Sequence, residues 1–330
     1  MLKAALIGYG YWGPNIARNL ARSQDYELVA ICDKDPGQLA KARLVFGDSV
    51  AYVADYRAVV DDAAIDMCAV ALRDAIGQEV ARAVLRSKKH LFMEKPMATT
   101  LSDALLLQKL AEASGVHIHV DHILVFHPII RKIKAIIESG ELGELISFES
   151  NRANLGPHIK RDMNAMWDLA VHDLAILDYL CNGQPVRKVE CMGQKQFGQQ
   201  EIITYLTAKY DGFVAMIKSS WFSPLKERRI TISGSKKMIV FDDLQESEKL
   251  MVYDKGVELD AALFREYGSY EAKTRSGDLY VPYIEQEDSL LNSLGHFAGC
   301  IREGRPSIAG PEQAIRVLQI LETANADLAE

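Results

Sequence analysis

Along the first 120 residues, short continuous apolar runs alternate with longer segments in which apolar residues recur every three or four positions. Continuous runs are typical of buried strands, and the wider spacing is typical of helices with one buried face. The predicted strands are residues 3–10, 26–33, 66–72, 90–94 and 116–120. The predicted helices are residues 16–23, 37–46, 77–87 and 101–115, the last capped by Ser102 and ended by Gly115. This alternation predicts an α/β fold with a doubly wound parallel sheet.

The pattern changes after about residue 122. Residues 127–143 predict one amphipathic helix with a glycine stop, and a second helix is predicted near 167–181. Longer strand-like runs follow, at 144–153, 185–194, 202–210, 213–222, 228–234 and 237–243. They predict an open, mostly antiparallel sheet in a second α/β domain, before two terminal helices in the last 45 residues. We therefore expect domains at 1–122 and 123–330, with the terminal helices able to pack back on the first.

Composition excludes several classes of protein. The chain has 330 residues, 48% apolar and 25% charged, as in ordinary globular proteins. Its net charge is -7, so the chain lacks the overall excess of basic residues that is typical of a nucleic-acid binder. No window approaches the roughly 18 apolar residues of a membrane helix. Gly8 and Gly10 interrupt the short N-terminal apolar run, so we expect no signal peptide. The cysteines, at 32, 68, 181, 191 and 300, form no C-x-x-C pair. We expect a soluble cytoplasmic protein with free thiols.

Residues Gly8–Gly13, with sequence GYGYWG, form a G-x-G-x-x-G motif between an apolar strand and a helix. Such glycines permit a tight turn, close approach of the backbone to a pyrophosphate, and close packing of helix on strand. Asp33 ends the second strand, where a carboxylate accepts ribose hydroxyls and repels the 2′-phosphate of NADP. These residues predict a Rossmann domain that binds NAD rather than NADP, although Lys34 would soften the repulsion; a structural glycine turn is the alternative. The residues assigned to the cofactor here are Gly8, Tyr9, Gly10, Tyr11, Trp12, Gly13, Asp33 and Lys34.

Two further motifs carry residue types suited to proton transfer. Lys95, followed by a proline, ends a predicted strand at the carboxyl edge of the sheet, where doubly wound folds bind ligands. Asp168 and His172 lie four residues apart and share one face if the segment is helical. Histidine titrates near neutrality and is able to accept an alcohol proton, while the carboxylate orients it or binds a neighbouring hydroxyl. Taken singly, an exposed turn lysine and a helix-surface ion pair are the plain alternatives.

Other polar residues are ambiguous. His117 and His119 share a strand face and lead to His122, but no carboxylate or cysteine cluster accompanies them, so we expect no metal. Asp173 and Asp178 are expected to be solvated or to cap a helix. Basic and amide residues flank the Asp168 segment: Asn151, Arg152, His158, Lys160 and Arg161 before it, and Lys226, Arg228 and Arg229 after it. Guanidinium groups match phosphate oxygens, so these residues could hold a diphosphate; ordinary surface charge is the alternative.

Jointly, these motifs resemble the glucose-fructose oxidoreductase/inositol dehydrogenase (Gfo/Idh/MocA) family over essentially the whole chain. The resemblance is carried by GYGYWG at 8–13, CDKD at 32–35, MEKP at 93–96, GELGEL at 140–145 and WDLAVHD at 167–173. It implies that Lys95, Asp168 and His172 are catalytic and contact the substrate. The cofactor would be bordered by Leu72, Glu94, Lys95 and His122.

A narrower similarity is to bacterial UDP-N-acetylglucosamine 3-dehydrogenases, over residues 8–15, 151–162, 219–243 and 277–284. It implies NAD-dependent oxidation at C3 of a UDP-linked N-acetylhexosamine, held by Asn151, Arg152, Arg161 and Arg228. A free polyol or sugar dehydrogenase and a non-catalytic dinucleotide sensor are the alternatives. The chain departs from the family pattern at Leu72-Arg73, in place of Thr/Ser-Pro, at Gln78, in place of His, and at Lys88-Lys89-His90, in place of Gly-Lys-His.

Self-association is also expected. An open sheet face would expose apolar residues such as Ile202, Val214 and Ile217, and exposed apolar patches mark interaction sites. We therefore expect a homodimer or homotetramer formed through the C-terminal sheet.

Overall fold

The computed structural model describes residues 1–330 except 73, 157–162, 197, 199, 260–271 and 329–330. The chain divides into two compact units. Unit 1 comprises Met1–His127 and Glu287–Gln319, and unit 2 comprises Pro128–Gln286 and Ile320–Glu330. The division falls after His127 rather than after the expected residue 122. It also gives unit 1 a segment from near the C-terminus.

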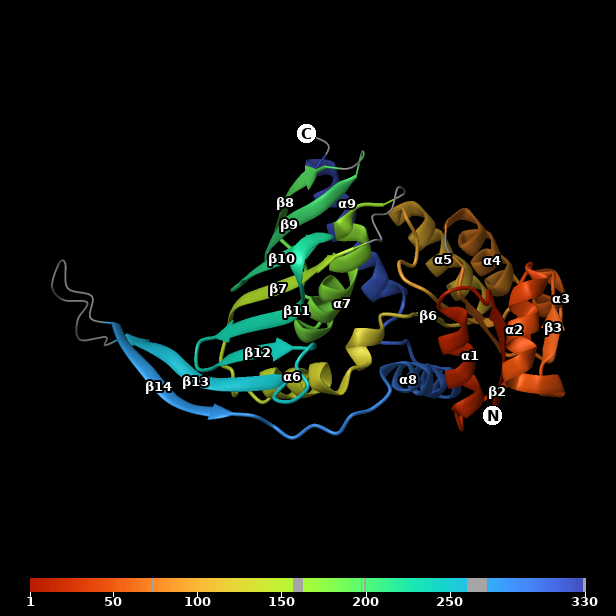
Figure 1. The fold of residues 1–330 in the computed structure, drawn as a ribbon, viewed down its shortest axis with the longest axis horizontal. Coiled ribbons are helices and arrows are strands. Elements are labelled where there is room, and N and C mark those ends of the chain that lie inside the picture. Colours follow the sequence, from red (N-terminus) through yellow and green to blue (C-terminus); the bar gives the residue numbers. More distant parts are fainter. Residues whose placement is uncertain (73, 157–162, 197, 199, 260–271, 329–330) are drawn as a thin grey trace. The chain divides into compact units, whose positions relative to one another are not determined.

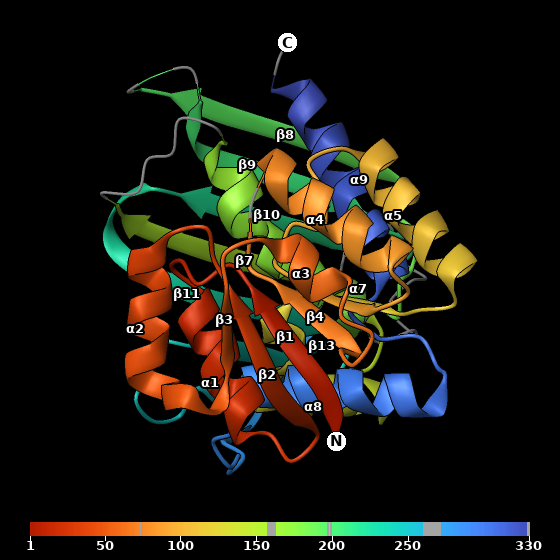
Figure 2. The same cartoon turned by 90° about the vertical axis from the view of Figure 1, so that its right-hand side faces the viewer.

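Over the described residues, unit 1 contains a six-stranded parallel sheet in the order β3-β2-β1-β4-β5-β6. This order reverses direction between β1 and β4, as in dinucleotide-binding folds, and confirms the predicted fold class. The strands are β1 (Leu2–Ile7), β2 (Tyr26–Cys32), β3 (Ala51–Val53), β4 (Met67–Val70), β5 (His90–Met93) and β6 (Ile118–Val120). The helices, seen in Figure 2, are α1 (Gly13–Arg22), α2 (Pro36–Phe46), α3 (Tyr56–Val60), α4 (Asp74–Arg86), α5 (Leu101–Ser114) and α8 (Ser289–Glu303).

Three local features of unit 1 differ from the sequence expectations. β3 and α3 were not predicted, because each is too short to show a period. The prediction that Ser102 caps α5 is wrong, since the Oγ1 of Thr100 accepts the hydrogen bond from the backbone N–H of Asp103. Gly115 ends α5 in the left-handed conformation, as predicted, with φ of 67°.

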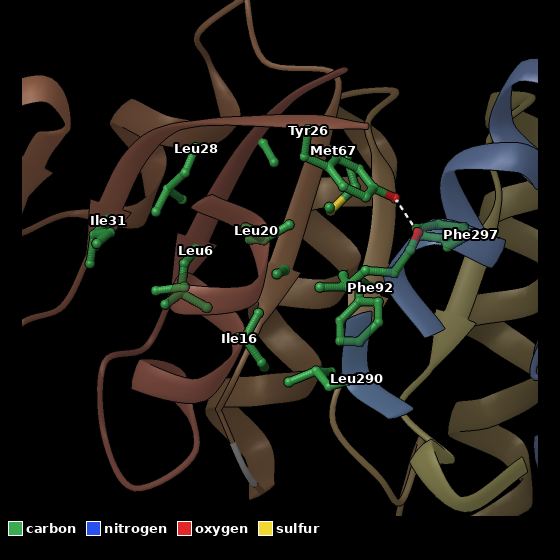
Figure 3. Packing of buried hydrophobic residues seen from close by; sticks show 14 of the residues in the cluster. Leu6, Ile16, Leu20, Tyr26, Leu28, Ile31, Met67, Phe92, Leu290 and Phe297 are labelled. Atoms are coloured by element: carbon green, nitrogen blue, oxygen red, sulfur yellow. Dashed lines mark hydrogen bonds between the residues drawn. The ribbon is translucent and has the colours of Figure 1, made fainter. Parts of the chain in front are cut away.

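The core of unit 1 joins segments from both ends of the chain (Figure 3). Leu6, Ile16 and Phe92 are fully buried in one cluster with Leu294 and Phe297 of α8. The hydroxyl of Tyr26 donates to the carbonyl of Leu294 at 3.1 Å. Because α8 completes this core, the segment from residue 287 belongs structurally to unit 1.

Unit 2 is built on an eight-stranded sheet in the order β14-β13-β12-β11-β7-β10-β9-β8 over the described residues (Figure 1). Its β10–β7 pair is parallel, and the other strand pairs among the described residues are antiparallel. The strands are β7 (Leu145–Leu155), β8 (Lys188–Lys195), β9 (Glu201–Lys209), β10 (Val214–Ser220), β11 (Phe222–Gly234), β12 (Met238–Asp242), β13 (Leu250–Leu259) and β14 (Ala272–Tyr280). β13 and β14 were not predicted.

One predicted helix of unit 2 is shorter than expected, and another has the expected extent but begins with a π-helical turn. The helix expected over 127–143 is α6 (Pro128–Glu138), and the one near 167–181 is a π-helical turn, η3 (Met166–Ala170), followed by α7 (Val171–Leu180). The last helix, α9 (Pro311–Asp327), runs across the division between the units. None of the helices in the described part of the chain is long and apolar enough to span a membrane.

The two faces of the unit 2 sheet differ in exposure. Ala215 and Ile217 of β10 are fully buried, whereas the alternate residues Val214 and Met216 are 42% and 44% exposed. The prediction that Ile202 and Ile217 are exposed is therefore wrong, because both lie on the covered face. Of the three residues named from the sequence, Val214 alone faces outward. The exposed face also carries Met192 and Tyr205, on β8 and β9.

Candidate active site

The glycine-rich turn of unit 1 joins β1 to α1. A Cβ atom on Gly13 would lie 2.2 Å from the carbonyl oxygen of Gly8, and one on Gly8 would lie 2.8 Å from the carbonyl oxygen of Ala71. Gly8 also has a φ of +100°, which side chains disfavour. A Cβ on Gly10 would meet nothing within 4 Å. Two glycines are thus required by packing, and the middle one leaves open space beside the backbone, as close approach of a pyrophosphate demands.

The other residues of the turn have different environments. Tyr9 is buried in the core, so only its backbone is available to a ligand, whereas the Tyr11 side chain is 90% exposed. Trp12 is partly buried, and its indole Nε1 donates to Oδ2 of Asp121 at 3.3 Å. α1 begins at Gly13 with a proline in its first turn. Pro14 has no N–H, and the N–H of Asn15 donates to the carbonyl of Trp12 at 2.9 Å, so the positive end of the helix dipole is the feature of α1 that favours phosphate oxygens. The turn fits the pyrophosphate of a dinucleotide.

Asp33 follows β2 and contacts the glycine-rich turn directly. Its Oδ2 accepts a hydrogen bond from the backbone N–H of Tyr9 at 2.6 Å, and its Oδ1 accepts one from Asp35 at 2.9 Å. Each carboxylate oxygen has a second acceptor position, which suits a ribose hydroxyl. Lys34 is exposed. The sequence placed Asp33 at the ribose but did not predict that it also braces the turn.

The loop after β5 carries Lys95. The Gln78 side chain on α4 donates from Nε2 to the carbonyl of Met97 at 2.7 Å and so fixes this loop. Gln78 replaces the histidine of the family pattern, and the sequence did not reveal this role. Leu72, two residues after β4, packs beside Gly8, while Arg73 lies outside the described residues.

Asp121 and His122 follow β6 and are buried, with exposed fractions of 3% and 2%. Burial raises the pKa of Asp121 to about 7, while the Trp12 hydrogen bond and the Lys95 charge oppose this rise. Burial, assisted by the Lys95 charge, lowers the pKa of His122 to about 3. Among the described residues, neither ring nitrogen of His122 nor the Oδ1 of Asp121 has a hydrogen-bond partner. Lys95, Asp121, His122 and Trp12 thus form one group at the carboxyl edge of the sheet.

His119 belongs to the core rather than to this group. Its ring nitrogens contact the hydroxyls of Ser307 and Ser293, each at 2.8 Å, and its ring stacks on Phe92. Burial lowers the pKa of His119 well below its usual value. His117 stacks on His90. The part of the chain that the structure describes contains no cluster of His, Cys, Asp and Glu suited to a metal ion.

In unit 2, Asp168 lies in the π-helical turn η3 and His172 in the first turn of α7, both partly buried. The indole Nε1 of Trp221 donates to Oδ2 of Asp168 at 3.2 Å. Trp221 is itself 1% exposed and packs against Leu169 and Ile202, so it holds the carboxylate firmly. π-helical turns occur frequently at functional sites, which agrees with a functional Asp168.

Arg152 and Arg228 are already engaged within unit 2. The Nε and Nη2 of Arg152 donate to the two oxygens of Asp173, each at 2.8 Å, and Asp173 is fully buried. The Nη1 and Nη2 of Arg228 donate to the carbonyl of Ala153 and to Oδ1 of Asn154. Burial and the charge of Arg152 lower the pKa of Arg228.

The prediction that Asp173 and Asp178 are solvated or cap a helix is wrong. Both are buried within α7, whose N-cap residue is Ala170, and Asp173 pairs with Arg152. Asn151 is partly buried on β7 beside Arg152. His158, Lys160 and Arg161 lie outside the described residues.

A six-stranded parallel sheet of this order, with a glycine-rich turn before α1 and an acid after β2, defines a dinucleotide-binding α/β protein. Comparison with known proteins gives the family. Residues 2–122 match the profile described as an oxidoreductase family with an NAD-binding Rossmann fold, and residues 130–240 match the GFO/IDH/MocA C-terminal domain. The chain belongs to the Gfo/Idh/MocA family of NAD-binding oxidoreductases.

Individual relatives are distant. The chain is 25% identical over 185 residues to inositol 2-dehydrogenase of Salmonella paratyphi B, and it spans about half the length (55%) of that protein. It is 23% identical to myo-inositol 2-dehydrogenase of Thermotoga maritima, over 100% of this chain and 97% of the relative. The solved structure of UDP-N-acetylglucosamine 3-dehydrogenase GnnA from Acidithiobacillus ferrooxidans is similar, with a TM-score of 0.82, 18% identity and coverage of 99% and 97% of the two chains. At that identity the structural similarity shows the fold alone.

Proposed function

We propose that the protein oxidises a secondary alcohol of a sugar or polyol to a ketone, with NAD as the oxidant. The observation that carries this proposal is the position of Lys95, beside buried Asp121 and His122 at the carboxyl edge of an NAD-binding sheet. A non-catalytic sensor would need the glycine-rich turn but not this lysine. The inositol dehydrogenases among the relatives agree with chemistry at a secondary alcohol.

The residues proposed to hold NAD are those with fitting geometry in unit 1. The Gly8–Gly13 turn and the start of α1 would bind the pyrophosphate, and Asp33 would accept the adenosine ribose hydroxyls. Leu72, Glu94 and His122 would border the remainder. When bound, NAD supplies the hydride acceptor. Because a carboxylate repels a 2′-phosphate, Asp33→Ser should reduce the preference for NAD over NADP, while Asp33→Asn retains an acceptor for the Tyr9 N–H.

The proposed catalytic residues have distinct tasks. His172 would accept the proton of the reacting hydroxyl as general base. Lys95 would donate a hydrogen bond to the same oxygen and make it more acidic. Asp168, held by Trp221, would fix the orientation of the sugar or of His172.

For the substrate we propose a UDP-linked N-acetylhexosamine oxidised at C3. This rests on the sequence resemblance over residues 151–162, 219–243 and 277–284. The hydrogen bonds that Arg152 and Arg228 make within the protein bear on which residues would hold its diphosphate. Since Asp173 occupies two donor groups of Arg152, and Ala153 and Asn154 occupy two of Arg228, the contact would fall largely to Arg161 and its neighbours, with Asn151.

A free polyol or unphosphorylated sugar is the second candidate substrate. The engaged state of Arg152 and Arg228 favours it, because an uncharged ring needs no free guanidinium. The curated relatives named as inositol dehydrogenases favour it too.

One experiment separates these proposals. NAD reduction is followed at 340 nm with UDP-N-acetylglucosamine, other UDP-sugars, inositols and free hexoses, each with and without millimolar UDP. A nucleotide-sugar enzyme is inhibited competitively by UDP, whereas a polyol enzyme is indifferent to it. Absence of turnover with every sugar, despite NAD binding, would contradict the dehydrogenase proposal.

We also propose that the protein self-associates through the exposed face of the unit 2 sheet, as a homodimer or homotetramer. Met192, Tyr205, Val214 and Met216 support this, because together they present an apolar patch on adjacent strands. Sedimentation velocity at several concentrations tests it.

A further inference from the structure

We infer that Asp121 is a positioning residue for the reaction: its carboxylate keeps Lys95 protonated and ties it to the cofactor-binding turn through Trp12. This inference deepens the proposed function and rests on it. Asp121 was not among the site residues expected from the sequence. Its carboxylate would act on Lys95 rather than on the substrate.

The backbone brings these side chains together. Met93 of β5 pairs with Val120 of β6, and the N–H of Asp121 donates to the carbonyl of Met93 at 2.8 Å. Asp121 therefore follows β6 at the place where the neighbouring strand β5 ends in Met93, and Lys95 lies two residues after Met93. From the other side, the Nε1 of Trp12 reaches Oδ2 of Asp121 at 3.3 Å. One carboxylate thus joins the glycine-rich turn to the end of β5.

The Asp121 carboxylate is buried, so its interactions have a large effect on its energy. Asp121 is 3% exposed, and among the described residues its Oδ1 has no hydrogen-bond partner. A buried oxygen without a partner is costly unless a charge or a ligand compensates it. Lys95 supplies that charge, because its ammonium is close enough to lower the pKa of Asp121 against the effect of burial.

The other titratable groups around Asp121 do not replace it. His122, next in sequence, is held neutral, since burial lowers its pKa to about 3. On the β5 side the titratable groups are Glu94 and Lys95. The glycine-rich turn contributes Trp12, which does not titrate. Beyond His122, toward α8, His119 is likewise held neutral by burial. The raised pKa of Asp121 places the change of its charge near neutral pH.

The consequence concerns the protonation state of Lys95. Burial alone favours a neutral amine, and a nearby carboxylate favours the ammonium. A lysine that must donate a hydrogen bond to the reacting oxygen needs the ammonium at working pH. Removing the charge of Asp121 should therefore lower the pKa of Lys95. Activity should then be lost at a lower alkaline pH than in the wild type.

The test measures Lys95 directly. Competitive acylation with acetic anhydride across a pH series, read by peptide mass spectrometry, gives the pKa of Lys95 in the full chain. Asp121→Asn keeps an oxygen for Trp12 but removes the charge, and it should lower the pKa of Lys95 by about 1–3 units. The alkaline limb of kcat should move by the same amount. Trp12→Phe, which breaks the tie but keeps the charge, should leave the pKa of Lys95 close to the wild-type value.

The labelling experiment can fail or succeed independently of the proposed function. Labelling needs no turnover, so it decides the inference even if no substrate is oxidised. If Asp121→Asn does not fold, the wild type still decides, because its labelling curve for Lys95 should show a second inflection near pH 7 as Asp121 titrates. A single inflection, or an unchanged pKa in a folded Asp121→Asn variant, would overturn the inference.

Discussion

The two sheets of this protein differ in how their side chains are buried. In unit 1, a central parallel strand is apolar along its whole length: Met67–Val70 of β4 are all buried. In unit 2, β10 alternates, with Ile217 buried and Met216 exposed. Parallel sheets are covered on both faces, whereas antiparallel sheets are able to leave one face open. The difference leaves unit 1 with its chemistry at strand ends, and unit 2 with a whole sheet face available for contacts.

In the proposed function, unit 1 binds the cofactor and unit 2 supplies the general base, and His172→Ala is the variant with the largest expected effect. We expect kcat to fall by roughly 10²–10⁴-fold, because a general base contributes about that much. The Kd for NAD, measured by fluorescence titration, should stay unchanged because the turn at Gly8–Gly13 is intact. Near-normal turnover would place the base elsewhere.

The packing of unit 1 can be tested at two glycines of the same turn. Gly13→Ala forces a Cβ to within 2.2 Å of a backbone oxygen and should reduce the free energy of unfolding by about 1–3 kcal/mol. Gly10→Ala is the matched control, because its Cβ meets no protein atom. It should leave stability within about 0.5 kcal/mol but weaken NAD binding. Equal stability of the two variants, by urea denaturation, would contradict the geometry.

Acid should destabilise unit 1 more than unit 2. Burial holds the folded pKa of His90 at about 4, that of His122 at about 3 and that of His119 well below its usual value. The unfolded chain binds protons below about pH 6.5, so each such histidine removes up to ~1.4 kcal/mol per pH unit as pH falls. Asp121 has the opposite sign, because its raised pKa favours folding at low pH.

Burial also lowers the pKa of His117, so four histidines against one carboxyl predict a net loss of stability in unit 1 between about pH 6.5 and 4. Hydrogen exchange at pH 5 and 7, corrected for intrinsic rates, should show protection falling first in β5 and β6. Earlier loss in β9 and β10 of unit 2 would show that the histidines do not control acid stability.

The smallest expected change in stability is at the open sheet face. Met216→Glu should change the free energy of unfolding by no more than about 0.5 kcal/mol, as surface substitutions do, while abolishing self-association. Ile217→Glu, one residue along on the covered face, should unfold the unit because it buries an unpaired charge. Sedimentation velocity and chemical denaturation measure both. A Met216→Glu protein that self-associates normally would remove this face from the proposed interface.

The sequence predicted the parallel sheet well, because its buried strands are continuous apolar runs with helices between them. It missed β3, which is three residues long, and β13 and β14. Alternation in β10 indicated two faces but not which one is covered. That is decided by how η3 and α7 pack, so Ile202 and Ile217 were assigned to the wrong face.

The candidate site was predicted to the extent that its residues lie in local motifs. Gly8–Gly13, Lys95 and the Asp168–His172 pair could be read from neighbouring residues. The contacts that support them join distant positions: Trp12 and Asp121 are 109 residues apart, and Asp168 and Trp221 are 53 apart. Such pairs leave no local pattern. The position of Asp121 directly after a predicted strand was the one signal that could have indicated it.

The free thiols give this chain its own probes of local opening. Cys68, in β4 of unit 1, and Cys191, in β8 of unit 2, are buried, and burial raises the pKa of each to about 12. A thiol reagent attacks the thiolate, so neither residue reacts appreciably until its strand separates. Modification rates at the two cysteines therefore time the opening of each unit separately, without any engineered label. The wild-type chain would therefore show which of the two units opens first.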